Sequence, residues 1–371
     1  FTPVPFDHPL WIVYSSGTTG MPKPIVHGHG GSIIEALKSN ALHLDLREGD
    51  RFFWYSSTNW IIWNLLVHTL LSGCTIVQFD GNPGHPDMGR LWDLAARTRT
   101  DVFGASAAYI AQCMKSGVEP RSCGDISRIR TVCSSGSPLP VDGYVWVYEH
   151  VNADLLLASI SGGTDPGAAF VGSCPILPQY AGEMQCRCLG AAVEAWNEQG
   201  QPLVDEVGEL VCVQPMPSMP LYFWGDEGNR RYLDSYFDMF PGVWRHGDWI
   251  RITPRGGAVI YGRSDATINR QGIRFGTSEL YRVIDTHPDV LDSLAIDLEF
   301  LGRPSWLGLF VVLRPGVTLS AELVADLKSR VKQALSPRHV PDAVHVVPAI
   351  PYTLTGKKLE VPIKRLLLGQ S

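Results

Sequence analysis

The stretch from Tyr14 to Lys23 has the composition of a phosphate-binding loop. Seven of its ten residues are Gly, Ser, Thr or Lys, and the apolar run 10–13 leads into it. Glycines let backbone N–H groups point inward, hydroxyls add donors and a lysine adds charge, so such a loop can hold an oligophosphate. Walker A is excluded, because its lysine directly follows the last glycine, whereas Lys23 follows Gly20 by three residues. The ordered spacing favours phosphate binding over a flexible surface loop.

Six further segments carry candidate site residues: 54–60, 134–138, 161–165, 245–248, 261–279 and 351–357. Asp165 is chemically suited to Mg²⁺, which takes one or two carboxylates together with phosphate oxygens and water. Asp248 could accept both hydroxyls of a ribose through its two oxygens. Taken alone, each segment has a structural alternative, such as aromatic packing, a strand-end turn, an N-cap aspartate or a solvated arginine.

The elements that must position these groups alternate in the first part of the chain. Extended segments are expected at 10–14, 51–55, 75–79 and 131–134, and helices at 32–44, 61–71, 88–97 and 141–150. Such alternation predicts an α/β fold with a parallel, helix-covered sheet.

The rest of the chain changes character twice. Residues 171–264 read as short extended pieces separated by Gly and Pro, which predicts a small antiparallel barrel or sheet. Residues 265–371 mix helix and strand over the length of a small α/β domain. We therefore expect a large domain at 1–264, with an α/β part at 1–170 and a β part at 171–264, and a C-terminal domain at 265–371.

Composition narrows the functional classes. A net charge of −6 gives no electrostatic footprint for nucleic acid. The eight cysteines contain no C-x-x-C pair, so reduced, buried thiols in a cytoplasmic protein are expected. Polar residues and a glycine interrupt the apolar stretch 60–79, which favours a buried helix and strand over a membrane span. The sequence leaves the oligomeric state open between monomer and homodimer.

The segment Ser-Ser-Gly-Thr-Thr-Gly-Met-Pro-Lys at 15–23 resembles the signature loop of the adenylate-forming enzymes, which include acyl-CoA synthetases, luciferases and peptide-synthetase adenylation domains. The other segments follow in the family's order. The resemblance covers residues 10–364 and implies a mobile C-terminal domain. The family normally has a further part of the large domain upstream, and the start at Phe1, shortly before the loop, predicts that this part is missing here.

The resemblance implies a role for each motif. ATP and its phosphates would be bound by Ser15, Ser16, Gly17, Thr18, Thr19, Gly20, Lys23, Ser137, Pro138, Thr164, Asp248, Arg263 and Arg274. Asp165, where the family usually has glutamate, would hold Mg²⁺. The acyl pocket would include Trp60, Ile61 and Gly162. Gly272 would leave room for the CoA arm, Asp265 would be the hinge, and Lys357 would be catalytic. For the adjacent Lys358, an ordinary surface charge is the alternative.

Substrate choice depends on finer similarity. Where acetyl-CoA synthetases carry a pocket-closing tryptophan, this chain has Gly162, which is expected to open space for a longer or more polar acid. The amino-acid sequences of segments 159–165, 269–272 and 351–357 are similar to those of acetoacetyl-CoA synthetases. The implied reaction joins acetoacetate to CoA with ATP, releasing AMP and pyrophosphate. Two alternatives stay open: another short- or medium-chain acyl-CoA synthetase, and a catalytically incomplete nucleotide-binding fragment.

Overall fold

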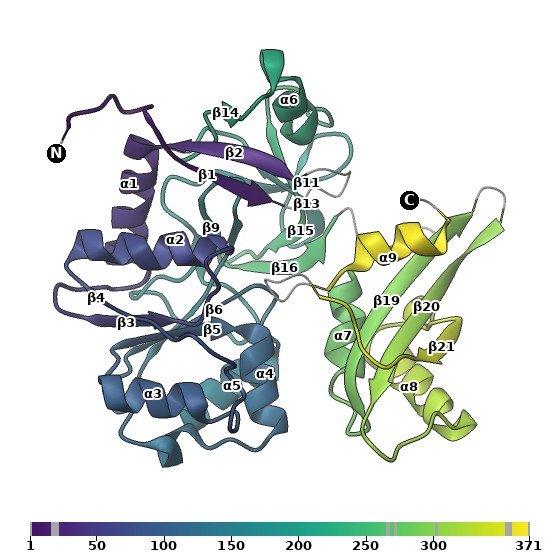
Figure 1. Ribbon diagram of the computed structural model, residues 1–371. Helices are drawn as coiled ribbons and strands as arrows, with labels where there is room; N and C mark the ends of the chain where they lie inside the picture. Colours follow the sequence, from purple (N-terminus) through teal and green to yellow (C-terminus); the bar gives the residue numbers. More distant parts are fainter. Residues whose placement is uncertain are drawn as a thin grey trace. The chain divides into compact units, whose positions relative to one another are not determined.

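The computed structural model describes residues 2–15, 22–264, 268–270, 273–300, 303–352 and 358–369. The chain forms two compact units (Figure 1). The first comprises Phe1–His246 with Ile250–Ile260, and the second comprises Gly247–Trp249 with Tyr261–Ser371.

A five-stranded sheet in the order β4-β3-β5-β6-β7 is the centre of the first unit. All its neighbouring strands are parallel, which confirms the predicted parallel sheet. Its strands are β3 (Arg51–Trp54), β4 (Thr75–Val77), β5 (Val102–Ser106), β6 (Thr131–Ser135) and β7 (Leu156–Ser159). The helices of this region are α1 (His29–Lys38), α2 (Ile61–His68), α3 (Arg90–Thr98), α4 (Ala107–Lys115) and α5 (Val141–His150), with short turns at Ser39–His43, Thr69–Ser72 and Pro120–Cys123.

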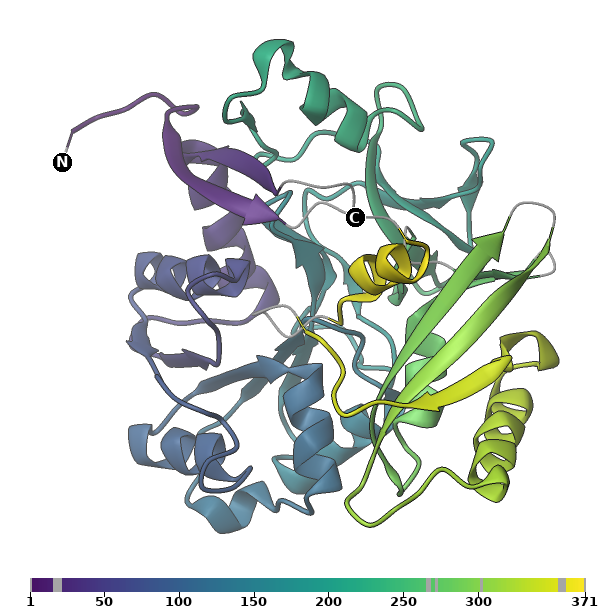
Figure 2. The same cartoon turned by 45° about the vertical axis from the view of Figure 1, so that its right-hand side comes forward.

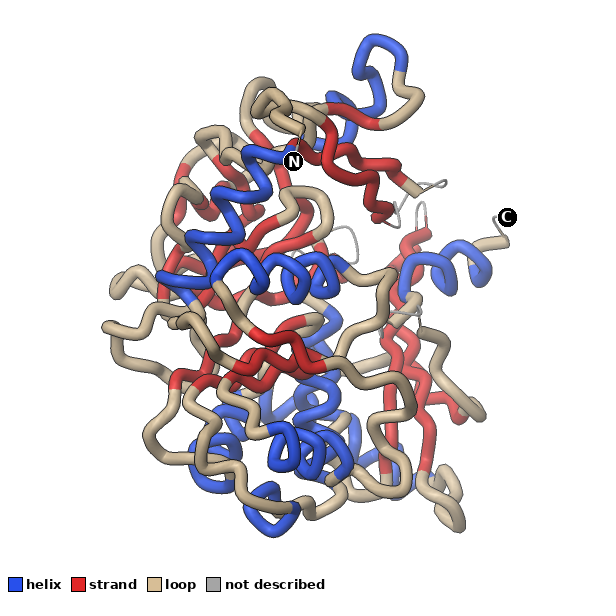
Figure 3. The backbone as a smooth tube through the Cα atoms, turned by 60° about the vertical axis from the view of Figure 1, so that its left-hand side comes forward, coloured by secondary structure: helices blue, strands red, loops and turns tan. Residues whose placement is uncertain are grey.

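The two faces of this sheet carry separate cores, because successive side chains of a strand point to opposite faces. Phe53 and Phe103 are fully buried in the cluster that includes residues of α3, α4 and α5. Phe52 and Trp54 are buried in the other cluster, with residues of α2. Figure 3 shows the strands, in red, between the helices, in blue. Helices on both faces are what a parallel sheet requires.

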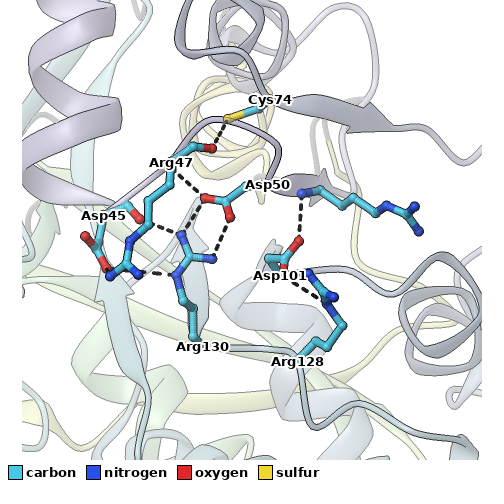
Figure 4. Close-up of polar contacts among 8 residues, drawn as sticks. Asp45, Arg47, Asp50, Cys74, Asp101, Arg128 and Arg130 are labelled. Carbon is cyan, nitrogen blue, oxygen red and sulfur yellow. Dashed lines mark hydrogen bonds and ion pairs between the residues drawn. The ribbon is translucent and has the colours of Figure 1, made fainter.

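An ion-pair network joins the amino ends of the strands (Figure 4). Arg130, just before β6, binds both carboxylate oxygens of Asp50, just before β3. Arg130 also donates to the carbonyl of Asp45 at 2.6 Å. Asp101, just before β5, accepts from the Arg51 backbone N–H at 2.9 Å and from Arg128 at 2.7 Å. The network fixes the strand starts, at the edge away from the strands' carboxyl ends.

A three-stranded sheet, β1-β2-β14, is built from distant parts of the chain. The hairpin of β1 (Pro9–Ser15) and β2 (Lys23–Gly28) is antiparallel, and β14 (Tyr222–Phe223) pairs with β2. In Figure 2 the hairpin is purple. The segment 10–14 is therefore extended as expected, but it lies outside the parallel sheet. The short return through residues 16–22 explains this, since a parallel partner requires a crossover of a dozen or more residues.

Two antiparallel sheets follow, and both are open. One has the order β10-β9-β8, and the other has the order β12-β11-β13-β15-β16. The sequence predicted either a small barrel or a sheet in this region, and the described strands form open sheets. Their bounds are β8 (Ser161–Gly163), β9 (Ala168–Gly172), β10 (Cys186–Arg187), β11 (Val193–Trp196), β12 (Pro202–Leu203), β13 (Val207–Cys212), β15 (Trp244–Ile252) and β16 (Ala258–Arg263). Helix α6 (Arg230–Tyr236) follows the 3-10 turn Glu227–Asn229.

The second unit contains a small α/β sheet in the order β19-β20-β21. One hydrophobic core contains residues of this sheet together with residues of α7 and α8. A second core contains other residues of the sheet together with residues of α9. Figure 2 shows α8 and α9 on opposite sides of the green strands. The elements are β17 (Ile268–Arg270), β18 (Ile273–Phe275), α7 (Thr277–Ile284), β19 (Val290–Phe300), β20 (Arg303–Leu313), α8 (Ala321–Ala334), the turn Pro337–His339, β21 (Ala343–Val346) and α9 (Glu360–Leu367).

None of the helices in the described ranges has the length and apolar character that crossing a membrane requires. All eight cysteines are free thiols; five of them are buried as expected, whereas Cys123, Cys174 and Cys186 are partly exposed.

Candidate active site

Three of the motif segments follow the carboxyl ends of strands in the parallel sheet. Residues 54–60 begin at the last residue of β3, residues 134–138 begin in the last two residues of β6, and residues 161–165 come after the end of β7. The carboxyl ends of parallel strands lie at one edge, which is where open α/β sheets bind ligands. At this edge a Cβ built on Gly136 would lie 3.5 Å from the indole of Trp60. Trp60 and the loop carrying Ser137 and Pro138 are thus neighbours.

Lys23 and Asp165 form an ion pair beside the predicted phosphate loop. Ser15 and Lys23 are opposite each other in the β1–β2 pair, so both ends of the loop 16–22 are fixed by strands. The ammonium of Lys23 contacts the Asp165 carboxylate through Oδ1. The hydroxyl of Tyr236, at the end of α6, donates to the same oxygen at 2.5 Å. Lys23 and Asp165, whose roles were predicted separately, are therefore in contact, and Tyr236 binds the same carboxylate.

Asp165 is held as an anion. Burial alone would raise its pKa, but the positive charge of Lys23, the nearby His246 and the hydrogen bonds from Lys23 and Tyr236 outweigh burial. The net effect lowers the pKa of Asp165 to about 2. A carboxylate in this state can bind a cation without first losing a proton.

Tyr236 is a site residue that the sequence analysis missed. Its ring stacks on Trp244 with centroids 3.6 Å apart, and the Lys23 ammonium lies 4.6 Å from the Tyr236 centroid. The lysine Nζ also donates to the tyrosine hydroxyl at 3.2 Å. Tyr236 is 2% exposed, so its hydroxyl has a fixed position. The available signal was a pair of tyrosines one helical turn apart, at 232 and 236, which core packing explains equally well.

His27 connects β2 to the turn that carries Asp165. Its Nε2 lies 3.0 Å from the carbonyl oxygen of Thr164, and its Nδ1 lies 2.9 Å from that of Ser218. The Ser218 hydroxyl donates to the carbonyl of Pro166 at 2.6 Å. Burial lowers the pKa of His27, although both carbonyls oppose the shift. Lys23 and His27 therefore both bind the 164–166 turn, and Thr164 takes part through its backbone. His27 was also missed, because a histidine in a strand carries no spacing signal.

The space expected at Gly162 is absent. A Cβ built on Gly162 would lie 2.1 Å from the carbonyl oxygen of Ala168 and 2.6 Å from the Cα of Ala169. The β8–β9 pair has an irregularity between Ser161 and Gly162, which brings the two backbones close. The expected reason for the glycine is therefore corrected. The absence of a side chain at Gly162 allows β8 and β9 to approach closely, and the backbone of Ala168 and Ala169 fills the space that we expected for an acyl tail.

Asp248 and Arg263 lie together in the second unit. Nη1 of Arg263 is 3.4 Å from Oδ1 of Asp248, and the arginine side chain is 47% exposed. Gly247 has a φ of +86°, and a Cβ there would lie 3.0 Å from the guanidinium. The glycine thus serves both the turn and the arginine. The ordered carboxylate and the accessible guanidinium are suited to polar and anionic parts of one ligand.

The remaining predicted residues contribute little geometry. Arg274 lies in β18 opposite Asn269, and its side chain is not described. Ile61 begins α2 and is partly buried, and Trp60 packs against the core beneath that helix. The other predicted residues lie outside the described ranges: Ser16, Gly17, Thr18, Thr19, Gly20, Asp265, Gly272 and Lys357.

Comparison with known proteins identifies the family. The profile of the AMP-binding enzyme family matches residues 2–223, and that of the AMP-binding enzyme C-terminal domain matches residues 282–357. Acetoacetyl-CoA synthetase of Gallus gallus is 42% identical over 371 residues, which are 100% of this chain and 56% of the relative. Acetoacetyl-coenzyme A synthetase of Rhizobium meliloti is 44% identical over 100% of this chain and 57% of its own length. The chain spans about half the length of the curated relatives it matches.

Solved structures agree. Acetoacetyl-CoA synthetase from Streptomyces lividans has a TM-score of 0.93 and 52% identity, over 99% of this chain and 56% of that one. A benzoate CoA ligase from Burkholderia xenovorans has a TM-score of 0.80 at 23% identity, over 97% of this chain and 69% of that one, which shows a shared fold. Since the family profile covers more than half of the sequence and the fold agrees, this chain belongs to the AMP-binding enzyme family.

Proposed function

We propose that the chain acts in an acetoacetate–CoA ligase, which forms acetoacetyl-adenylate from acetoacetate and ATP and passes the acyl group to CoA. The reaction class is supported by the Lys23–Asp165 pair, a cation and an ionised carboxylate beside the segment that we propose binds phosphate. The choice of acetoacetate is supported by the similarity to acetoacetyl-CoA synthetases along all of this chain.

The first half-reaction brings two anions together, since a carboxylate must attack the α-phosphorus of ATP. Charge neutralisation and in-line positioning supply most of the rate in such transfers. We assign Lys357 to this task. Lys23, with Ser15 and the loop residues 16–20, would hold the leaving pyrophosphate. Thr164 would lie near the α-phosphate, and Ser137 and Pro138 near the adenine.

Asp165 is the residue that we assign to Mg²⁺. A single ionised carboxylate suits this ion, which completes its shell with phosphate oxygens and water. The described residues contain no group of three His, Cys, Asp or Glu side chains that could form an all-protein site. When bound with ATP, the ion would supply positive charge to the phosphate oxygens. Lys23 would then exchange Asp165 for phosphate, while Tyr236 would keep the carboxylate in place.

Asp248 would accept the ribose hydroxyls, and Arg263 and Arg274 would meet phosphate. In the second half-reaction the CoA thiol attacks the adenylate carbonyl and AMP leaves. We propose that the C-terminal domain, 265–371, turns about Asp265 between the two steps, with Gly272 beside the CoA arm and Trp60 and Ile61 beside the acyl group. Enclosure of both steps in one site would protect the adenylate from water. The eight free thiols suit a cytoplasmic enzyme.

The test separates the half-reactions in Lys357→Ala. We expect adenylate formation to be lost. This step is measured as acetoacetate-dependent pyrophosphate exchange. Thioester formation from supplied acetoacetyl-adenylate should persist, because that step does not join two anions. Equal loss in both assays would assign Lys357 a structural role, and wild-type protein without acetoacetate-dependent exchange would refute the ligase proposal. A panel of short- and medium-chain acids tests the substrate.

A second candidate is nucleotide binding without turnover, which the motif at residues 15–23 would explain equally well when taken alone. Calorimetry combined with an AMP assay distinguishes the two. ATP binding without acid-dependent AMP release would support this second candidate.

A further inference from the structure

Lys358 carries an ammonium that is largely enclosed. Its Nζ lies 3.0 Å from Oδ1 of Asp292 and 3.4 Å from Oδ2 of Asp285, and it also donates to the backbone carbonyl of Ser293. The ring of Tyr281 lies beneath it, with 3.8 Å from Nζ to the centroid. The lysine side chain is only 15% exposed. Three acceptors match the three N–H groups of an ammonium, so this lysine is not the ordinary surface charge that the sequence allowed.

Asp292 holds a second residue with its other oxygen. The hydroxyl of Tyr352 donates to Oδ2 of Asp292 at 2.7 Å, while Oδ1 binds Lys358. Tyr352 and Lys358 are the residues immediately before and after the segment 353–357. They form a β-bridge with each other, and the N–H of Leu359 donates to the carbonyl of Pro351 at 3.1 Å. One carboxylate of β19 thus holds both flanks of the segment that ends in Lys357.

The partners of this arrangement are themselves fixed. Oδ1 of Asp285 accepts from the Ser293 hydroxyl at 2.6 Å. The hydroxyl of Tyr281 donates to Glu360 at 2.5 Å and accepts from the Ala295 N–H at 3.1 Å. These bonds join α7, β19 and the start of α9. A lysine with its charge committed to two carboxylates and a carbonyl is unavailable to a substrate, so the two adjacent lysines must have different roles.

We propose that Tyr352, Asp292 and Lys358, which we call the Asp292 clasp, are positioning residues: they hold together the two residues that flank segment 353–357 and thereby act on Lys357. The inference rests on the proposed ligase function. The clasp acts through Lys357, and none of its members contacts the reacting atoms. Positioning of this kind has large kinetic effects, since a displacement of about 1 Å can cost roughly a hundredfold in rate.

The experiment measures both half-reactions in the full-length protein for Lys358→Met and Tyr352→Phe. Methionine keeps the apolar stem without the charge, and phenylalanine removes only the hydroxyl. We expect kcat for adenylate formation to fall by roughly 10- to 100-fold in Lys358→Met and by about 3- to 10-fold in Tyr352→Phe. KM for ATP and thioester formation from supplied adenylate should change by no more than about twofold, since neither uses Lys357. Lys332→Met, an exposed lysine of α8, is the control.

The double variant sharpens the test. Because both side chains act through Asp292, the double variant should lose little more than Lys358→Met alone, whereas independent effects would multiply. Equal losses in both half-reactions, or an adenylation rate that stays within about twofold of wild type in both single variants, would overturn the clasp.

A readout without activity keeps the clasp separate from the ligase proposal. Hydrogen exchange at the Leu359 amide, which bonds to Pro351, should become faster in Lys358→Met and in Tyr352→Phe, and stay unchanged in Lys332→Met. If wild type forms no adenylate, the proposed function fails, and this exchange result still decides whether the clasp holds the flanks. Unchanged exchange in both variants would refute it. If Lys358→Met does not fold, Tyr352→Phe carries the same comparison.

Discussion

Lys23 and Asp165 are 142 residues apart in the sequence, yet they form an ion pair in which the carboxylate is also bound by Tyr236. Each member of the pair has a separate proposed ligand, phosphate for the lysine and Mg²⁺ for the aspartate. Without nucleotide their charges neutralise each other, so neither is left as an unpaired buried charge. On nucleotide binding, the Lys23–Asp165 pair would be replaced by a Lys23–phosphate pair and an Asp165–Mg²⁺ pair. The contribution of each residue can then be measured separately.

Replacing Lys23 with methionine should weaken ATP binding by about tenfold or more, since a charged hydrogen bond contributes about 1.5–3 kcal/mol. The pKa of Asp165 should rise, because its main positive neighbour is gone while burial remains. Calorimetry gives the affinity, and carbon-detected NMR titration gives the pKa. Unchanged ATP affinity would remove Lys23 from the phosphate site.

Tyr236→Phe deletes one hydroxyl and keeps the stack on Trp244. Because Asp165 then loses a donor, we expect its pKa to rise and kcat for adenylation to fall by roughly 10- to 100-fold, the equivalent of one hydrogen bond to a charged group. Tyr232→Phe, one turn earlier in α6, is the matched control and should leave the rate unchanged. Equal effects of the two substitutions would argue against a specific role for the Tyr236 hydroxyl.

Gly162→Ala should destabilise the fold, because its new Cβ would meet the backbone of Ala168 at 2.1 Å. Overpacking of this kind costs about 1–3 kcal/mol, or more where backbone blocks relaxation. Urea unfolding measures the loss, and Gly163→Ala, whose Cβ would lie 3.3 Å from His246, should lose less. The ratio of kcat/KM for acetoacetate to that for acetate should stay constant. A drop in that ratio would restore Gly162 to the acyl pocket.

Arg130→Met should lower the free energy of unfolding by about 2–3 kcal/mol, since it leaves the Asp50 carboxylate, 12% exposed, without its arginine. The network lies at the amino ends of the strands, away from the proposed site, so kcat should not change in the folded protein. Arg97→Met, which breaks an exposed pair with Asp93, should cost less than about 0.5 kcal/mol. A large change in KM with intact stability would contradict this assignment.

Acidification should destabilise the protein below about pH 6.5 through His68. Burial lowers the pKa of His68 from 6.5 to about 4, so between these values the unfolded state binds a proton that the folded state does not. Stability is therefore lost as pH falls through this window, by about 1–2 kcal/mol at pH 5. His27 and His43, whose pKa values burial also lowers, act in the same direction. Unfolding of His68→Gln at pH 7 and pH 5 should show a smaller difference than wild type.

The sequence was sufficient for the existence of a parallel sheet and for its strands β3, β4 and β6, because these are apolar runs between helices with clear periodicity. Helix α5 has the expected bounds, Val141–His150, whereas the expected helix 32–44 is α1 followed by a π-helical turn. Strands β5 and β7 and helix α4 were missed; β5 contains Gly104 and Ala105, which have weak strand preference. The partner of a strand is also invisible locally, so 10–14 was expected in the wrong sheet.

The candidate site was predictable one residue at a time and only where a motif existed. Lys23 and Asp165 were identified separately, but their contact depends on how two loops meet. Tyr236 and Lys358 have residue types that usually pack or face solvent, and only their neighbours distinguish them. At position 162 the sequence shows only that a side chain is absent. The structure shows that the backbone of Ala168 and Ala169 occupies the place where that side chain would lie.

The pairing of β2 with β14 has a consequence for the order of events during synthesis. Val26 and Ile25 find their partners at Tyr222 and Phe223, so the strand that begins with Lys23 remains without one neighbour until most of the first unit has left the ribosome. Contacts between residues so far apart close long loops and form slowly. The strand that leads out of the proposed phosphate loop should therefore be among the last parts of the first unit to acquire its final neighbours, and we expect that a nascent chain ending before residue 222 does not yet bind ATP.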